Sequence, residues 1–142
     1  MKIGRISTAV PCVLAIACLS LVADMVQAHN GDTFMISNHI QIAKWSQNAT
    51  PTEAALRQRL EDEGFTPRRW ANEPGFVYDA HQHEYHKVIV VVHGSIVFGF
   101  PVDGQPTVLQ AGDRLDLPAR VRHNAVVGPD GVVCLEAHVD SS

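Results

Sequence analysis

Short runs of β-branched and aromatic residues, separated by turn residues, dominate the chain beyond Arg68. Runs of this kind are typical of strands. The predicted strands are Phe76–Ala80, Lys87–Val92, Ser95–Phe100, Thr107–Gln110, Arg114–Leu117, Asn124–Val127 and Val132–Val139. The predicted turns between them are His93-Gly94, Val102-Asp103-Gly104, Ala111-Gly112-Asp113 and Gly128-Pro129-Asp130-Gly131. Many short strands at near-regular spacing predict a sandwich, a jelly roll or a barrel.

One short helix is predicted ahead of the strands, over 51–63. Thr50 supplies a capping hydroxyl, and Pro51 suits the first helical position. Leu56 and Leu60 lie four residues apart and therefore on one face of the helix. We expect this face to pack on the strands and the charged face to be solvated.

Composition and charge narrow the class of protein. With 142 residues the chain has room for one domain, and 46% hydrophobic against 18% charged residues can form a core. The 11 Lys and Arg residues are outnumbered by 15 Asp and Glu residues, for a net charge of −4. Because phosphate contacts need clustered positive charge, this balance argues against nucleic acid as a partner.

The N-terminal segment has the order of residues found in a secretory signal peptide. Lys2 and Arg5 form a basic start, 6–23 is uncharged and apolar, and the small residue Ala28 precedes a polar stretch. This order predicts cleavage after Ala28 and a secreted or periplasmic protein without a stable membrane span.

Two alternatives to this signal peptide over 1–28 remain open. The apolar run is just long enough to stay as a membrane anchor. Translation that starts at Met25 or Met35 would instead give a cytoplasmic protein. Beyond the signal peptide we expect an N-terminal segment, 29–67, that carries the helix, and a β-barrel domain over 68–142.

Histidine is the component that points to chemistry. Four of the eight histidines fall within a short stretch: His81, His83, His86 and His93. Residues i and i+2 of a strand project from the same face, so His81 and His83 can converge on one cation. Exposed histidines on a polar strand would give the same spacing by chance. The three cysteines are too few and too scattered for a cysteine-based zinc module.

Two segments combine histidine with turn glycines at fixed spacing: His81-Gln82-His83 followed by Gly94, and Gly112 followed by Pro118 and His123. In this order they resemble the paired motifs of the cupin superfamily, in particular its small single-domain members. The resemblance covers about 69–139. It implies an all-β fold, the cupin double-stranded β-helix or jelly-roll barrel, with one short N-terminal helix.

The resemblance also implies a metal site formed by His81, His83 and His123. The sequence departs from the motifs at three positions. Lys87 stands where the superfamily often has a glutamate as fourth ligand, Arg120 replaces a glycine, and Val127 replaces an asparagine. Three neutral imidazoles leave a divalent ion its charge and its open positions. The expected cofactor is one divalent transition metal, either Fe, Mn, Ni or Zn.

Lys87 and Glu136 are the candidate catalytic residues. An ammonium group beside a dication suffers desolvation and repulsion, so Lys87 is an inward functional lysine, the mark of a metal-free pocket, or a solvent-facing side chain. Glu136 shares one strand face with Cys134 and His138, and is an acid/base candidate, a replacement ligand or a surface carboxylate. A register slip by one residue would bring His86 into the place of Lys87 and give a four-histidine set.

These features predict a small exported cupin that binds one divalent metal and acts on, or binds, a small polar or anionic molecule. As an enzyme it would be a metal-dependent oxidoreductase, such as a dioxygenase, or an isomerase. The alternative is a metal-free binding or sensing module without catalytic activity, in which the histidines and Lys87 hold an anion directly. The resemblance also allows a homodimer formed through strand edges or the N-terminal segment.

Overall fold

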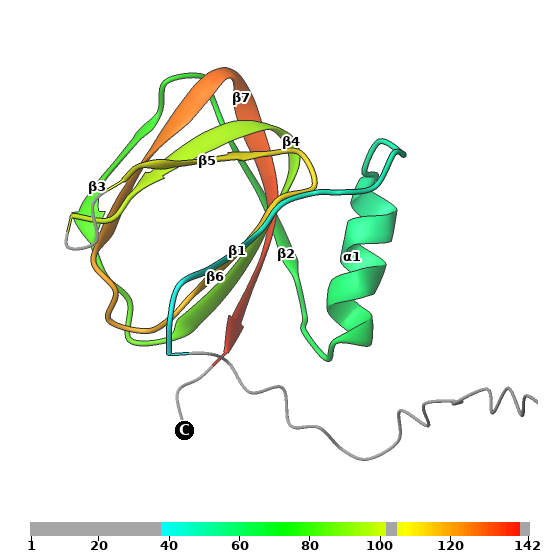
Figure 1. The fold of residues 1–142 in the computed structure, drawn as a ribbon, viewed down its shortest axis with the longest axis horizontal. Helices are drawn as coiled ribbons and strands as arrows, with labels where there is room; N and C mark the ends of the chain where they lie inside the picture. The colour runs from blue at the N-terminus through cyan, green and yellow to red at the C-terminus, as the bar shows by residue number, and fades with distance from the viewer. Residues whose placement is uncertain (1–37, 102–104, 140–142) are drawn as a thin grey trace, which may run out of the picture. The chain divides into compact units, whose positions relative to one another are not determined.

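The computed structural model of the protein describes residues 38–101 and 105–139 (Figure 1). The predicted signal peptide 1–28, the two alternative start residues Met25 and Met35, and the predicted turn at 102–104 lie outside the described residues. Among those described, no helix has the length and apolar character needed to cross a membrane.

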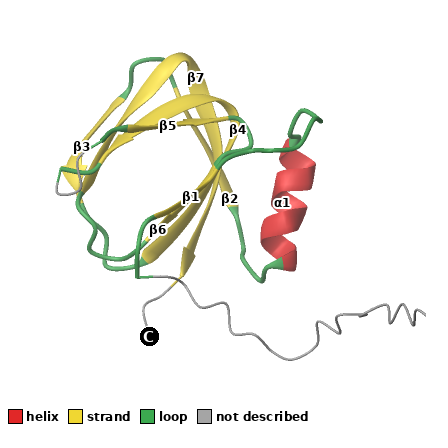
Figure 2. Cartoon of the chain, viewed as in Figure 1, coloured by secondary structure: helices red, strands yellow, loops and turns green. Residues whose placement is uncertain are grey.

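The described chain is antiparallel β-structure with one short helix (Figure 2), which confirms the all-β prediction. Its elements are β1 (Gln41–Ala43), α1 (Glu53–Asp62), β2 (Arg68–Asn72), β3 (Val77–His81), β4 (His86–Gly99), β5 (Thr107–Gln110), β6 (Arg114–Leu117) and β7 (His123–Val139). The strand order is β1-β6-β4-β7-β2, with β3 added on β7 and β5 added on β4. β5 and β6 have the predicted bounds, whereas β1 and β2 were not predicted from the sequence.

Two long strands, β4 and β7, carry the other strands of the sheet. They pair with each other from His86 opposite Val139 to Gly99 opposite Asn124. The first half of β4 also pairs with β6 and its second half with β5. In the same way β3 pairs with the first half of β7 and β2 with its second half. Each long strand is therefore shared by two strand groups, which wrap around a common interior (Figure 1).

The predicted breaks at His93-Gly94 and Gly128–Gly131 are wrong, because β4 and β7 each run through them. Gly94 pairs with Val132 but Ile96 pairs with Val127, so the ladder shifts at this point and 128–131 bulge out of it. Gly94 and Gly131 both have a φ of +74°, and a Cβ on Gly94 would collide with the carbonyl oxygen of Gly131. The turn residues therefore mark a bend of two paired strands and not two hairpins.

Helix α1 begins two residues later than predicted, at Glu53. The capping residue is Thr52 and not Thr50, because the Thr52 hydroxyl oxygen accepts a hydrogen bond from the Ala55 amide at 3.3 Å. Leu56 and Leu60 are buried, as expected for one packed face. They form a cluster with residues from the outer faces of β4 and β7: Val88, Val90 and Leu135.

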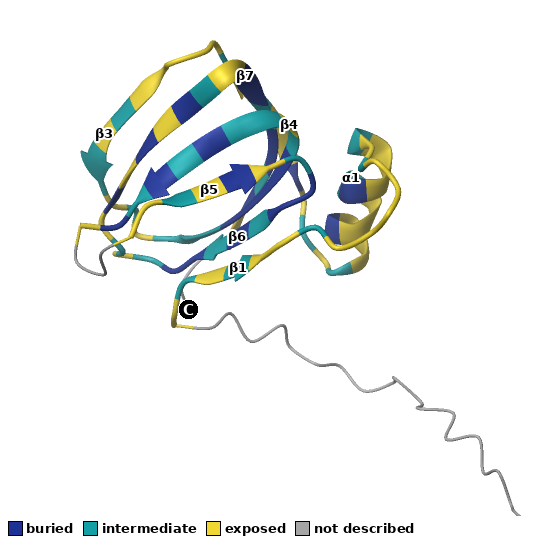
Figure 3. Ribbon diagram, turned by 45° about the horizontal axis from the view of Figure 1, so that its top comes forward, coloured by how far each residue is buried: buried dark blue, intermediate teal, exposed yellow. Residues whose placement is uncertain are grey.

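Strand β4 is mostly buried or half-buried (Figure 3), and its side chains alternate between two hydrophobic environments. Ile89 and Val91 belong to the barrel interior, whereas Val88 and Val90 belong to the cluster under the helix. Because side chains alternate along a strand, the residues that precede this run divide in the same way. Lys87 shares the inward face with Ile89, and His86 shares the outward face with Val88.

The segment ahead of the barrel is joined to it by Asp113. Strand β1, inside the predicted N-terminal segment 29–67, pairs with β6. The Asp113 carboxylate, 5% exposed, accepts hydrogen bonds from the backbone amides of Trp45 and Gln110, each at 2.9 Å, and from Lys44 at 2.7 Å. Burial alone would raise the pKa of Asp113, but the hydrogen bonds from Lys44, Gln110 and Trp45 lower it overall. Asp113 therefore has a structural role.

We expect Asp113→Ala to lose about 2–3 kcal/mol of unfolding free energy, because two backbone amides lose a buried charged acceptor. Asp113→Asn keeps one acceptor oxygen and should lose less. Asp130→Asn, at an exposed position, is the control and should match the wild type. Urea denaturation at neutral pH measures all three; an unchanged Asp113→Ala would contradict the structural role.

The same carboxylate predicts a dependence of stability on pH. Its pKa is lower in the folded chain than the ordinary value of 3.8, so its contribution is fully present above that value and is lost as the pH falls through the folded pKa. Between about pH 6 and about pH 2 the wild type should lose more stability than Asp113→Asn, which has no such proton to take up. Parallel losses in the two proteins would contradict this assignment.

Candidate metal centre

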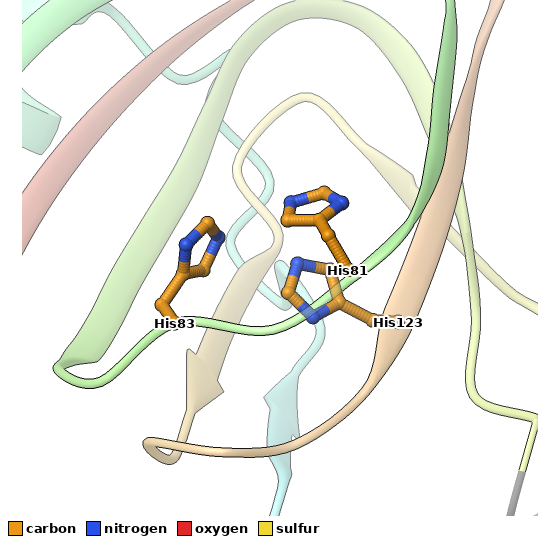
Figure 4. A group of neighbouring side chains, drawn as sticks. All are labelled: His81, His83 and His123. Carbon is orange, nitrogen blue, oxygen red and sulfur yellow. The ribbon is translucent and has the colours of Figure 1, made fainter.

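Three histidines from two separate parts of the chain meet inside the barrel (Figure 4). His81 ends β3 and pairs with His123, which begins β7, while His83 lies in the loop that follows β3. Their ring centroids are separated by 4.4 Å (His81–His123), 4.8 Å (His81–His83) and 5.2 Å (His83–His123). One ring nitrogen from each lies within 4.8 Å of the others. The structure thus brings the three predicted residues together, and their role as ligands stays a prediction.

Backbone carbonyls orient two of the three rings. The Nδ1 atom of His81 contacts the carbonyl oxygen of Asp79 at 2.5 Å, and Nδ1 of His123 contacts that of Val121 at 2.9 Å. A carbonyl oxygen can only accept, so each Nδ1 carries the proton in the neutral ring. The lone pair therefore lies on Nε2, as in a histidine whose other nitrogen is fixed for metal binding.

His83 supplies the observation that tests whether a metal fits. Its Nε2 is buried and has no hydrogen-bond partner among the described residues. A buried polar atom without a partner is costly, and a cation would satisfy it. Burial, followed by the positive charge of Lys87 and the neighbouring His123 and His81, lowers the pKa of His83 to about 4. The ring is therefore neutral near pH 7 and keeps a lone pair for a metal.

Burial also lowers the pKa of His123, although its hydrogen bond to the Val121 carbonyl opposes the shift. Two of the three rings are thus held in the neutral form that metal ligation requires. A set of three imidazoles with free Nε2 atoms suits Zn, Fe or Ni. The donor chemistry of this chain therefore fits the metal that the sequence predicts.

The loop that carries His83 is held by Arg120. The Arg120 amide donates a hydrogen bond to the His83 carbonyl oxygen at 2.7 Å, and its exposed side chain pairs with Glu84 at 2.9 Å. Arg120 has a φ of +64°, a left-handed conformation that favours glycine. Arg120 therefore adopts the backbone conformation that a glycine at this position would adopt without strain.

Lys87 faces inward, and the solvent-facing alternative is wrong. Its side chain is 14% exposed and its Nζ lies 3.2 Å from Oε1 of Glu136, which is 13% exposed. Glu136 also accepts hydrogen bonds from Nε1 of Trp70 at 3.1 Å and from Nε2 of His138. The two predicted catalytic residues are therefore an ion pair in the barrel interior, and Glu136 is not a surface carboxylate.

This ion pair and two of the histidines line one cavity of about 240 Å³. Its other walls come from four strands and are mainly apolar or aromatic: Trp70, Asn72, Tyr78, Ile89, Ile96, Phe98 and Ala125. Asn72 was missed because it lies on β2, which was not predicted from the sequence. The inward alternation after Lys87 is the signal that could have found Ile89.

The alternative set with His86 is wrong. His86 lies on the face of β4 opposite Lys87, and the close group of ligand atoms contains only the other three histidines. His93 is exposed as predicted, although it lies within β4 and not in a turn. Cys134 is a buried free thiol, and burial raises its pKa.

The sequence matches no family model and no curated relative. Its fold is similar to a DUF861 family protein from Thermotoga maritima, with a TM-score of 0.51 and 18% identity over 71% of this chain and 100% of that one. A cupin superfamily protein from Desulfitobacterium hafniense has a TM-score of 0.48 and 15% identity over 73% and 80% of the two chains.

A third similar structure is an RmlC-like cupin from Shewanella frigidimarina. It has a TM-score of 0.47 and 22% identity over 75% of this chain and 80% of that one. At such identities the likeness concerns the fold and not the chemistry. The two long strands β4 and β7, each paired with two strand groups, and the likeness to the Thermotoga maritima protein together show that the described chain has the cupin fold, a double-stranded β-helix.

Proposed function

We propose that the protein is a small exported cupin that holds one divalent transition metal with His81, His83 and His123. It would act on, or bind, a small anionic molecule in the adjoining cavity. The observation that carries the proposal is the convergence of three imidazoles, one of which has a buried Nε2 without a hydrogen-bond partner in the described part of the chain. Fe, Mn, Ni and Zn are the candidate ions.

A divalent ion in this place would supply a Lewis acid with open coordination positions. The backbone carbonyls of Asp79 and Val121 keep the His81 and His123 rings oriented toward it. Lys87 and Glu136 line the same cavity, where they can bind an anion or hold a proton at Nζ or Oε1. This arrangement favours a metal-dependent oxidoreductase or isomerase as the enzyme class.

Export and partners are part of the proposal and rest on the sequence alone. The order of basic, apolar and small residues in 1–28 supports a secreted or periplasmic location. The acidic net charge supports a small molecule rather than nucleic acid as partner. A homodimer is compatible with this proposal.

Metal titration tests the site directly. Protein purified without an affinity tag and treated with chelator should bind one equivalent of Zn²⁺ or Ni²⁺ by calorimetry, and the metal should raise its melting temperature. Each of His81→Ala, His83→Ala and His123→Ala should remove one of three ligands and abolish stoichiometric binding. His93→Ala, at an exposed position, is the control and should bind like the wild type.

Full-affinity metal binding by any of the three alanine variants would contradict the ligand set. A wild type that binds no metal but does bind small anions would favour the metal-free module, in which the histidines and Lys87 hold the anion directly.

Lys87→Glu should raise the affinity for the divalent metal. The change replaces an ammonium by a carboxylate in the place of the usual fourth ligand, and the repulsion between the new carboxylate and Glu136 is relieved by a cation. His86→Glu introduces a carboxylate on the opposite face of β4 and is the control, with an affinity close to that of the wild type. Equal effects of the two substitutions, measured by competition with a metal-binding dye, would show that Lys87 does not face the ion.

A further inference from the structure

A divalent metal at the histidines would leave the cavity with an excess of positive charge. Lys87 and Glu136 are its charged lining residues apart from the histidines, and as an ion pair they cancel. Three neutral imidazoles add nothing, so a bound divalent ion leaves a net charge of about +2. Uncompensated charge in a half-buried cavity is costly, and an anion removes part of that cost.

We propose that the metal-loaded cavity takes a compact aliphatic carboxylate, and that Lys87 is the residue that selects this anion over a neutral molecule of the same shape. The inference rests on the proposed function, because the histidines must first carry their cation.

Lys87 is built to receive such a group. Its ammonium has three N–H donors, and Glu136 occupies one direction at 3.2 Å. Glu136 in turn is fixed by Trp70 at one oxygen and by His138 at the other. The Glu136 carboxylate therefore fixes the position of the Lys87 ammonium through one contact. The other N–H donors of the ammonium can bind a second acceptor.

The ammonium also acts on the histidine side of the cavity. Lys87 lines the same cavity as His81 and His123. The positive field of Lys87 thus reaches the place where the imidazoles converge. An anion in the cavity interacts favourably with the ammonium and with the cation at the histidines, whereas a neutral molecule gains little from either.

The remaining walls of the cavity determine the size and polarity of the rest of the ligand. Ile89, Ile96, Phe98 and Ala125 form an apolar lining, and beside it the Tyr78 hydroxyl donates a hydrogen bond to Oδ1 of Asn72. The cavity has a volume of about 240 Å³. Pockets for drug-sized ligands are larger, about 300–1,000 Å³. The molecule that fits is a short hydrocarbon with a carboxylate at one end.

The test uses Co²⁺ as the metal and isobutyrate as the probe, with isobutyramide as its neutral isostere. The visible absorption of bound Co²⁺ reports a change in its surroundings without any enzymatic turnover. Isobutyrate should change the spectrum saturably, with an affinity at least about tenfold above that of isobutyramide. The much larger 1-adamantanecarboxylate should bind more weakly than isobutyrate, because the cavity limits size.

Charge variants separate selectivity from damage to the fold. Lys87→Met should lower the affinity for isobutyrate by about tenfold. It should keep or raise the affinity for Co²⁺, because a repelling cation is gone. Glu136→Gln should shift both affinities the other way, with tighter isobutyrate and weaker Co²⁺. The double variant Lys87→Met/Glu136→Gln leaves no unpaired side-chain charge and should still bind Co²⁺, with a smaller preference for isobutyrate over isobutyramide than the wild type has. A purely structural defect would lower both affinities together.

The outcomes distinguish the two levels of the proposal. If the wild type does not bind Co²⁺, the proposed metal function fails. If Co²⁺ binds but isobutyrate and isobutyramide have equal affinities, or Lys87→Met leaves their ratio unchanged, the metal site stands and the inference about Lys87 is overturned.

Discussion

The pairing of β4 with β7 is the constraint on which the rest of the structure depends. Both strands are long enough to pass from one strand group to the other, and they bend together where Gly94 meets Gly131. Their register places Ile89 opposite Glu136 and Lys87 opposite His138, so one inward face receives the ion pair. The same strand β7 starts with His123, which pairs with His81. A slip by one residue would turn Lys87 outward and His86 inward, and the cavity would lose its charged groups.

The sequence predicts the class of fold well because its signals are local. Runs of β-branched residues, turn glycines and the spacing of the two histidine segments each depend on a few neighbouring positions. The strand breaks at Gly94 and Gly128–Gly131 could not be separated from hairpins, because a positive φ is needed in both cases and only the tertiary register shows which applies. Strands β1 and β2 escaped prediction for the opposite reason. They are short, partly exposed and stabilised by distant partners, such as Asp113 for the segment around Trp45.

The candidate site divides along the same line. His81, His83 and His123 could be predicted because their spacing resembles known motifs, although His83 lies in a loop rather than on the expected strand. The pairing of Lys87 with Glu136 could not, since it depends on a contact between strands far apart in the sequence. The orphaned Nε2 of His83 and the hydrogen bond from Arg120 to the His83 carbonyl also exist only in three dimensions. Residue types therefore suggest the chemistry, and the strand register decides which groups share a cavity.

In the proposed metal site, Lys87 would be a departure from a motif that keeps the site and changes its selectivity. A glutamate in this place would be a ligand and would remove one unit of charge from the metal. Here the position carries a cation, but Glu136 brings a compensating charge at 3.2 Å, so the pair is neutral. The neutral pair repels a cation at the histidines less than a lone ammonium would. The positive charge that a glutamate ligand would have cancelled would then be compensated by a bound anion. The loss of an internal anion and the need for an external one are thus two consequences of the same substitution.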